Sequence, residues 1–149
     1  MRTLVVYDSV YGNTEKIAKA IGAAIPGEVK LLRAGLVGAS DLQGLDLLIV
    51  GAPTQGGRPT EAVQAFLGQA SMLSLGGMFA AAFDTRLTSK WVRIFGYAAP
   101  RIAERLKQQG GTVVGSPEGF FVKGKEGPLV EGELERAAAW AKGIVDSGK

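Results

Sequence analysis

The sequence has 149 residues, of which 46% are hydrophobic and 21% charged, values typical of one globular domain rather than a disordered chain. It contains neither cysteine nor histidine, which excludes disulfides, thiol nucleophiles, the usual zinc sites and every Ser-His or Cys-His catalytic pair. The remaining side chains are poorly suited to acid–base catalysis near neutral pH, so we expect any chemistry to come from a cofactor.

The formal net charge is +3 and the pI is about 9.3, but the lysines and arginines are spread along the chain. Without a Lys/Arg-rich run, a solvated surface is favoured over a nucleic-acid-binding patch. No apolar run reaches the ~18 residues needed to cross a bilayer, and Met1–Tyr7 is too short for a signal peptide. We therefore expect a cytoplasmic protein without a membrane span.

Apolar runs typical of buried strands recur along the chain. They lie at Leu4–Tyr7, Leu45–Val50, Met78–Phe83 and, as a fifth strand broken by Ser116-Pro117-Glu118, at 112–114 and 119–122. Glu28–Leu32 is a short alternating run that can form a further strand. Segments with apolar residues at helical spacing separate these runs. They lie at Glu15–Ile25, from Thr60 through Leu67, at Ala98–Gln109 and from Val130 to Val145. This alternation predicts one α/β domain, a doubly wound five-stranded parallel sheet with helices on both faces.

The loop Asp8–Thr14 joins the first predicted strand to the first predicted helix and reads Asp-Ser-Val-Tyr-Gly-Asn-Thr. Such a turn presents backbone N–H groups at the positive end of a helix, where a phosphate is bound without a cationic side chain. The loop matches neither the P-loop nor the Gly-x-Gly-x-x-Gly motif of dinucleotide sites. An ordinary connection, in which Ser9 or Asn13 caps the helix, is the alternative.

Two further loops are expected beside the first. One runs from Ala52 to Pro59 after the third predicted strand, and the other from Asp84 to Tyr97 after the fourth. In doubly wound sheets, ligands bind at the carboxyl ends of the strands, where the strand order reverses. The three loops therefore form the candidate site.

Short motifs in these loops resemble those of the flavodoxin-like family. The matching residues are Ser9, Gly12 and Thr14 of Ser/Thr-x-Thr-Gly-x-Thr, then Pro53, Thr54 and Gly57 of Pro-Thr-x-x-Gly, then Phe83, Asp84, Thr85 and Arg86 of Phe-Asp-Thr-Arg. Tyr11 stands where the family usually has threonine. The resemblance covers essentially the whole chain and implies the strand order 2-1-3-4-5.

The resemblance also implies that the chain binds FMN. The residues that it assigns to the cofactor are Ser9, Val10, Tyr11, Gly12, Asn13 and Thr14 around the phosphate, and Pro53, Thr54, Gln55, Gly56, Gly57, Asp84, Thr85 and Arg86 around the isoalloxazine ring. Trp91 is the predicted stacking aromatic, with Phe95 and Tyr97 as the other choices and packing as the alternative role. The two glycines of the second loop either let a peptide reverse its orientation beside the ring or only permit a tight turn.

By the same resemblance, the function is electron transfer by bound FMN between a reductase and an acceptor protein, with no catalytic residue from the chain itself. Two alternatives stay open: an oxidoreductase of the same fold that acts on a quinone or on protoporphyrinogen, and a binding module that has lost flavin. Electron-carrier flavodoxins are typically acidic, so the positive net charge of this chain disfavours the basic partners that such carriers use. The oligomeric state does not follow from the sequence.

Overall fold

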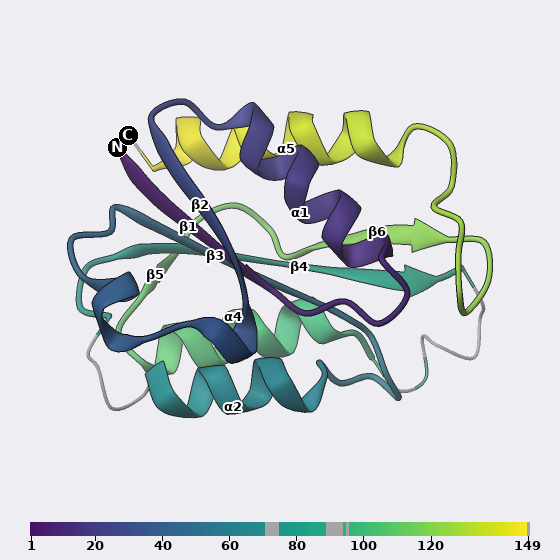
Figure 1. The fold of residues 1–149 in the computed structure, drawn as a ribbon, viewed down its shortest axis with the longest axis horizontal. Helices are drawn as coiled ribbons and strands as arrows, with labels where there is room; N and C mark the ends of the chain where they lie inside the picture. The colour runs from purple at the N-terminus through teal and green to yellow at the C-terminus, as the bar shows by residue number, and fades with distance from the viewer. Residues whose placement is uncertain (71–74, 89–93, 95, 149) are drawn as a thin grey trace.

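A computed structural model describes residues 1–70, 75–88, 94 and 96–148. It contains a parallel sheet with the order β2-β1-β3-β4-β5, in which β6 also pairs with β4, as the resemblance predicts (Figure 1). The strands are β1 (Arg2–Tyr7), β2 (Glu28–Arg33), β3 (Leu47–Pro53), β4 (Phe79–Leu87), β5 (Thr112–Val113) and β6 (Glu118–Val122). The helices are α1 (Asn13–Ala24), α2 (Glu61–Ala70), α4 (Ala98–Gln108) and α5 (Glu133–Ser147), with short 3₁₀ turns η1 (Ala34–Leu36) and η2 (Ala39–Leu42).

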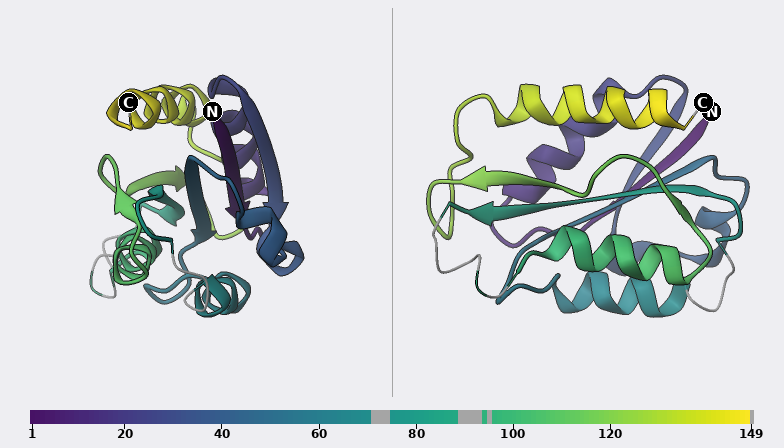
Figure 2. Two further views of the ribbon diagram at one scale, coloured as in Figure 1. Left: turned by 90° about the vertical axis from the view of Figure 1, so that its left-hand side faces the viewer. Right: turned by 180° about the vertical axis from the view of Figure 1, so that it is seen from behind.

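Helices cover both faces of the sheet, α1 and α5 on one and α2 and α4 on the other (Figures 1 and 2). The side chains of β1 show why two layers form, because successive residues of a strand point to opposite faces. Leu4 and Val6 belong to the core beneath α2 and α4, whereas Val5 and Tyr7 belong to the core beneath α1 and α5. The continuous apolar run of this strand is thus buried on both sides.

The fifth strand is broken, as the sequence predicts. β5 pairs with Phe79 and Ala80 at the start of β4, and β6 pairs with the far end of β4, from Phe83 to Leu87. The backbone N–H of Val114 still donates to the carbonyl of Ala80 (2.8 Å), after which the chain leaves the sheet until β6 begins. Both segments therefore lie on the same side of β4.

Three predicted boundaries are wrong by three residues or more. The strand expected at Leu45–Val50 is β3 and ends at Pro53, because its end pairs with Asp84 and Thr85 of β4, so Ala52 and Pro53 of the second predicted loop lie in a strand. The strand expected to end at Phe83 continues through Leu87, because the backbone of Asp84 pairs with β3 on one side and with β6 on the other. The last helix was expected from Val130, but α5 begins at Glu133. The N–H of Val130 instead donates to the carbonyl of Phe121 (2.9 Å), which holds this residue in an extended connection beside β6.

Among the residues that the structure describes, no helix is both long enough and apolar enough to cross a membrane.

Candidate functional site

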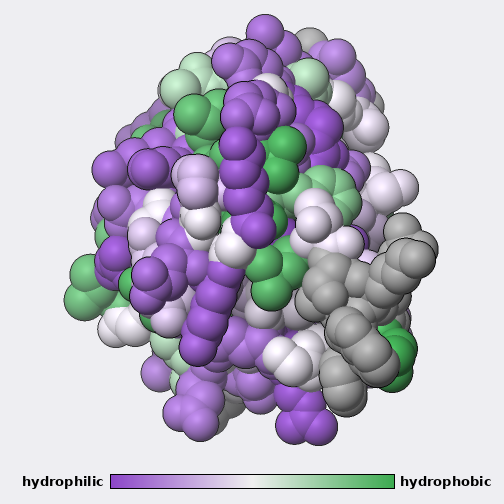
Figure 3. Space-filling view, turned by 90° about the vertical axis from the view of Figure 1, so that its right-hand side faces the viewer, coloured by the Kyte–Doolittle hydropathy of each residue, from purple (hydrophilic) through white to green (hydrophobic). Residues whose placement is uncertain are grey.

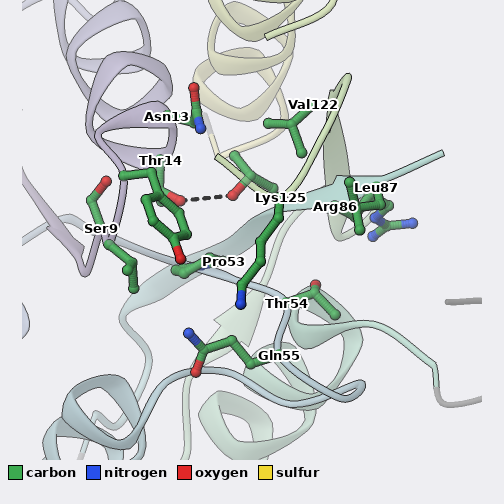
Figure 4. Close-up of a pocket in the computed structure, with 13 residues that line it drawn as sticks. Ser9, Asn13, Thr14, Pro53, Thr54, Gln55, Arg86, Leu87, Val122 and Lys125 are labelled. Carbon is green, nitrogen blue, oxygen red and sulfur yellow. Dashed lines mark hydrogen bonds between the residues drawn. The ribbon is translucent and has the colours of Figure 1, made fainter. Parts of the chain in front are cut away.

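A cavity of about 430 Å³ lies at the carboxyl ends of the strands, within the size range of small-molecule and cofactor sites (Figure 4). The three predicted loops supply most of its wall, together with the end of β4 and the loop after β6. The lining residues are Ser9, Val10, Tyr11, Asn13, Thr14, Pro53, Thr54, Gln55, Thr85, Arg86, Leu87, Val122 and Lys125. Figure 3 views this end of the molecule and shows apolar side chains at the surface among hydrophilic ones.

The structure brings ten of the predicted site residues to this cavity. Gly12, Gly56, Gly57 and Asp84 are described but do not line it, and Trp91 lies outside the described residues. Leu87, Val122 and Lys125 line the cavity without having been predicted. Lys125 could have been found from position alone, because its loop follows a strand that ends at the same edge of the sheet as the other three.

The N-cap position of α1 is Gly12, which makes no side-chain capping bond, so neither Ser9 nor Asn13 is the N-cap residue that the alternative interpretation expects. Ser9 nevertheless supports the start of the helix. The Ser9 Oγ accepts hydrogen bonds from the N–H groups of Gly12 (3.1 Å) and Glu15 (3.3 Å), and the Ser9 N–H donates to the carboxylate of Asp8 (2.9 Å). Asn13 has another role, because its Nδ2 donates to the carbonyl of Glu126 (3.1 Å) and so ties the first loop to the loop after β6. The bonds of Ser9 and Asn13 do not exclude ligand binding, since they leave other N–H groups of the loop free.

Four backbone N–H groups of the first loop have no hydrogen-bond acceptor among the described residues. They belong to Val10, Tyr11, Asn13 and Thr14. The last two lie in the first turn of α1, where backbone donors have no partner within the helix and where the helix dipole favours an anion. An unoccupied row of donors beside a cavity is what a phosphate group fits.

A buried hydrogen bond joins the first loop to β4. The hydroxyl oxygens of Thr14 and Thr85 are 2.7 Å apart, and both residues are almost fully buried (Figure 4). The bond uses one of the two hydroxyl hydrogens, so the other remains available to an acceptor in the cavity. The pair therefore fixes the depth of the pocket and still offers one donor.

Asp84 acts behind the cavity rather than in it. Its carboxylate is completely buried and accepts two hydrogen bonds from the guanidinium of Arg86 (2.7 and 2.8 Å) and one from the N–H of Ala99 (2.8 Å). Burial raises the pKa of Asp84, while the bond and the charge of Arg86 act in the opposite direction. Gly119 makes room for this pair, because a Cβ there would lie 2.0 Å from the Arg86 Nε. Asp84 therefore positions Arg86.

Tyr97, one of the three candidate stacking aromatics, has a different partner. Its ring lies 3.6 Å from the guanidinium carbon of Arg86, a cation–π contact on the side chain that Asp84 holds. Phe95, like Trp91, lies outside the described residues. Tyr11 is an aromatic residue that lines the cavity, and 46% of it is exposed.

The second loop closes as a tight turn. Gln55 and Arg58 exchange backbone hydrogen bonds (2.8 and 3.0 Å) across Gly56 and Gly57, whose φ angles of 57° and 80° are those of the two central residues of a type I′ turn. Thr54 ties the base of this loop to α4, because its Oγ1 accepts a hydrogen bond from the N–H of Ala98 (3.1 Å). The glycines thus serve the turn, and a reversal of the peptide between them stays a prediction.

The charged side chains that line the cavity, among the described residues, are both cations. Arg86 and Lys125 line the cavity, and no carboxylate of the described chain does. The same part of the chain holds no cluster of three acidic side chains arranged to bind a metal ion. The site can therefore receive an anionic organic ligand, with backbone donors at one end and a cationic side chain at the other.

The comparisons with known proteins agree with this geometry. The flavodoxin family model matches residues 5–140. The fold is similar to that of a flavodoxin from the domain Archaea (24% identity, TM-score 0.84, 99% of each chain covered) and to oxidised flavodoxin 1 from Bacillus cereus (21% identity, TM-score 0.82, 98% of each chain). It is also similar to 36% of the rubredoxin oxygen:oxidoreductase of Desulfovibrio gigas (22% identity, TM-score 0.79, 99% of this chain). No curated protein sequence matches the chain.

Proposed function

The chain belongs to the flavodoxin family, whose cofactor is FMN, and we propose that it carries electrons between a reductase and an acceptor protein. The observation that carries the proposal is the row of unpartnered N–H groups at the start of α1, beside a cavity of about 430 Å³. This arrangement fits a ligand that has a phosphate at one end and a larger body in the cavity.

In this proposal the first loop binds the phosphate of FMN. The N–H groups of Val10, Tyr11, Asn13 and Thr14 donate to its oxygens, and the dipole of α1 attracts its charge. Ser9 keeps the loop in place by accepting hydrogen bonds from the N–H groups of Gly12 and Glu15, and the spare hydroxyl hydrogen of the threonine pair adds a donor from the floor of the pocket. The phosphate is thus bound largely by neutral groups.

The second loop and the end of β4 frame the isoalloxazine ring. Pro53, Thr54 and Gln55 form one side, and Arg86 with Leu87 forms another. When bound, FMN supplies the capacity to accept and release one or two electrons. The chain binds and orients the ring and shields part of it from water.

The proposal is tested with purified protein. Bound oxidised flavin absorbs near ~450 nm, and FMN should bind more tightly than riboflavin, which lacks the phosphate and differs from FMN in little else. A colourless protein that takes up no added FMN would contradict the proposal and support a binding module without flavin.

A second assay separates a carrier from an enzyme. The FMN-loaded chain is mixed with NAD(P)H and menadione, with and without an added flavodoxin reductase. A carrier should turn over slowly until the reductase is present. Rapid turnover by the chain alone would favour the quinone oxidoreductase over the carrier.

A further inference from the structure

Lys125 is the uncompensated charge of the described cavity wall. The other charged lining residue, Arg86, is paired with the buried Asp84, and Figure 4 shows its guanidinium pointing away from Lys125. The ammonium group of Lys125 has no carboxylate within 4.0 Å among the described residues. Lys123, two residues earlier, is instead paired with Glu131 at 2.7 Å. The same short loop thus offers one free and one neutralised lysine.

The loop that carries Lys125 has a defined position relative to the cavity. Its ends pair through the N–H of Lys123 and the carbonyl of Pro128 (2.8 Å), and its tip is tied to α1 by the bond from Asn13 to the carbonyl of Glu126 (3.1 Å). In Figure 4 the side chain of Lys125 points into the pocket, and its ammonium group is directed toward the second loop, where Gln55 lies. This is the ring side of the pocket in the arrangement proposed above, away from the helix terminus.

We propose that Lys125 sets the redox preference of the site by favouring reduced over oxidised FMN. The proposal rests on the proposed function. Oxidised FMN has a neutral ring; two electrons from the reductase and one proton from water convert it to a reduced ring with one negative charge. A cation close to the ring attracts that charge and has no comparable effect on the neutral ring. Lys125 therefore raises the two-electron reduction potential of the bound cofactor.

The test compares Lys125→Gln with the matched control Lys123→Gln, which removes a charge from the same loop outside the cavity. Fluorescence titration gives the affinity for oxidised FMN, and a reductive titration against a reference dye gives the potential of the bound cofactor. For Lys125→Gln we expect the ratio of reduced to oxidised affinity to fall about tenfold, which lowers the potential by about 30 mV. The control should change the ratio less than about twofold, since its charge is exposed and already paired.

Two further measurements make the result specific. Lys125→Arg keeps the charge and should restore most of the potential, whereas a purely packing role would give the two substitutions similar effects. Riboflavin should show the same shift as FMN, because the charge acts on the ring. If Lys125→Gln weakens both redox states of FMN equally and leaves riboflavin unaffected, Lys125 binds the phosphate and the inference is wrong.

An unchanged ratio in Lys125→Gln would likewise overturn the inference, but it would leave the carrier function intact as long as the protein still binds FMN. Failure of the wild-type chain to bind FMN would instead overturn the proposed function. The two failures are therefore distinguished by the first titration.

Discussion

The buried ion pair between Asp84 and Arg86 makes a strong prediction about stability. The carboxylate is 0% exposed and the Arg86 side chain is 13% exposed, so neither group can replace its partner with much water. Replacing Arg86 with Met removes two hydrogen bonds and leaves a buried carboxylate that only the N–H of Ala99 and other neutral groups stabilise. Breaking a buried pair in this way costs about 3–5 kcal/mol.

Urea denaturation followed by circular dichroism measures this loss. For a chain of this length it corresponds to a fall in Tm of roughly 9–15 °C. The double variant Asp84→Asn, Arg86→Met removes both charges, and we expect it to regain about 2 kcal/mol relative to Arg86→Met alone. This double variant also serves as the measurable protein if the single variant does not fold.

The pH dependence of the unfolding free energy checks the role of this ion pair independently. Burial raises the pKa of Asp84, and in Arg86→Met the opposing effect of Arg86 is absent. A carboxyl group whose folded pKa lies above its unfolded pKa stabilises the fold below the unfolded pKa, and this contribution is lost as the pH rises through the folded pKa. Arg86→Met should therefore be less destabilised at about pH 4 than at about pH 8. A loss below ~1 kcal/mol at both pH values, with no gain in the double variant, would refute the reasoning.

Three further predictions concern FMN binding and the stability of the fold. Thr14→Val should weaken FMN binding by about 1–3 kcal/mol in a fluorescence titration and leave riboflavin binding nearly unchanged; equal losses would mean that the phosphate lies elsewhere. Hydrogen bonding from Arg136 lowers the pKa of Glu133, so this contribution to stability is present above the unfolded pKa and is lost as the pH falls. Glu133→Gln should reduce the unfolding free energy by about 1–2 kcal/mol at neutral pH and flatten its decline in acid, and an unchanged slope would contradict this. Gly57→Ala should destabilise the fold by about 1 kcal/mol because of its positive φ, whereas Gly143→Ala, in open space within α5, should stabilise it by up to about 1 kcal/mol.

Much of the fold could be predicted because its signals are local. Apolar runs, helical spacing and turn residues indicate the order of the elements, and the interruption at Pro117 predicted that the fifth strand is broken. The end of β4 was not predictable in this way. Asp84 and Arg86 are polar residues typical of a loop. Asp84 lies in a strand because β3 and β6 pair on either side of it, and Arg86 lies in a strand because it pairs with β6. Backbone pairing between distant segments overrode local propensity here.

In the site, too, local segments were predictable and long-range contacts were not. The first loop was predictable because its donors come from a short strand–turn–helix segment. The end of the strand before Lys125 places its loop at the same edge of the sheet, but Lys125 itself carries no motif. Its approach to the cavity also depends on a bond between Asn13 and a residue 113 positions away. The contact of Tyr97 with Arg86 likewise depends on how α4 packs against β4.

Side-chain hydrogen bonds tie the loops of the site to other elements. Thr14 binds Thr85 of β4, Asn13 binds the loop after β6, and Thr54 binds the start of α4. These bonds use side chains that would otherwise face the cavity, and they leave the backbone donors of the first loop for the ligand. The sheet brings the loops together, and the bonds between them set the shape of the pocket before any ligand enters. Such preorganisation favours binding, because less conformational freedom remains to be lost when the ligand arrives.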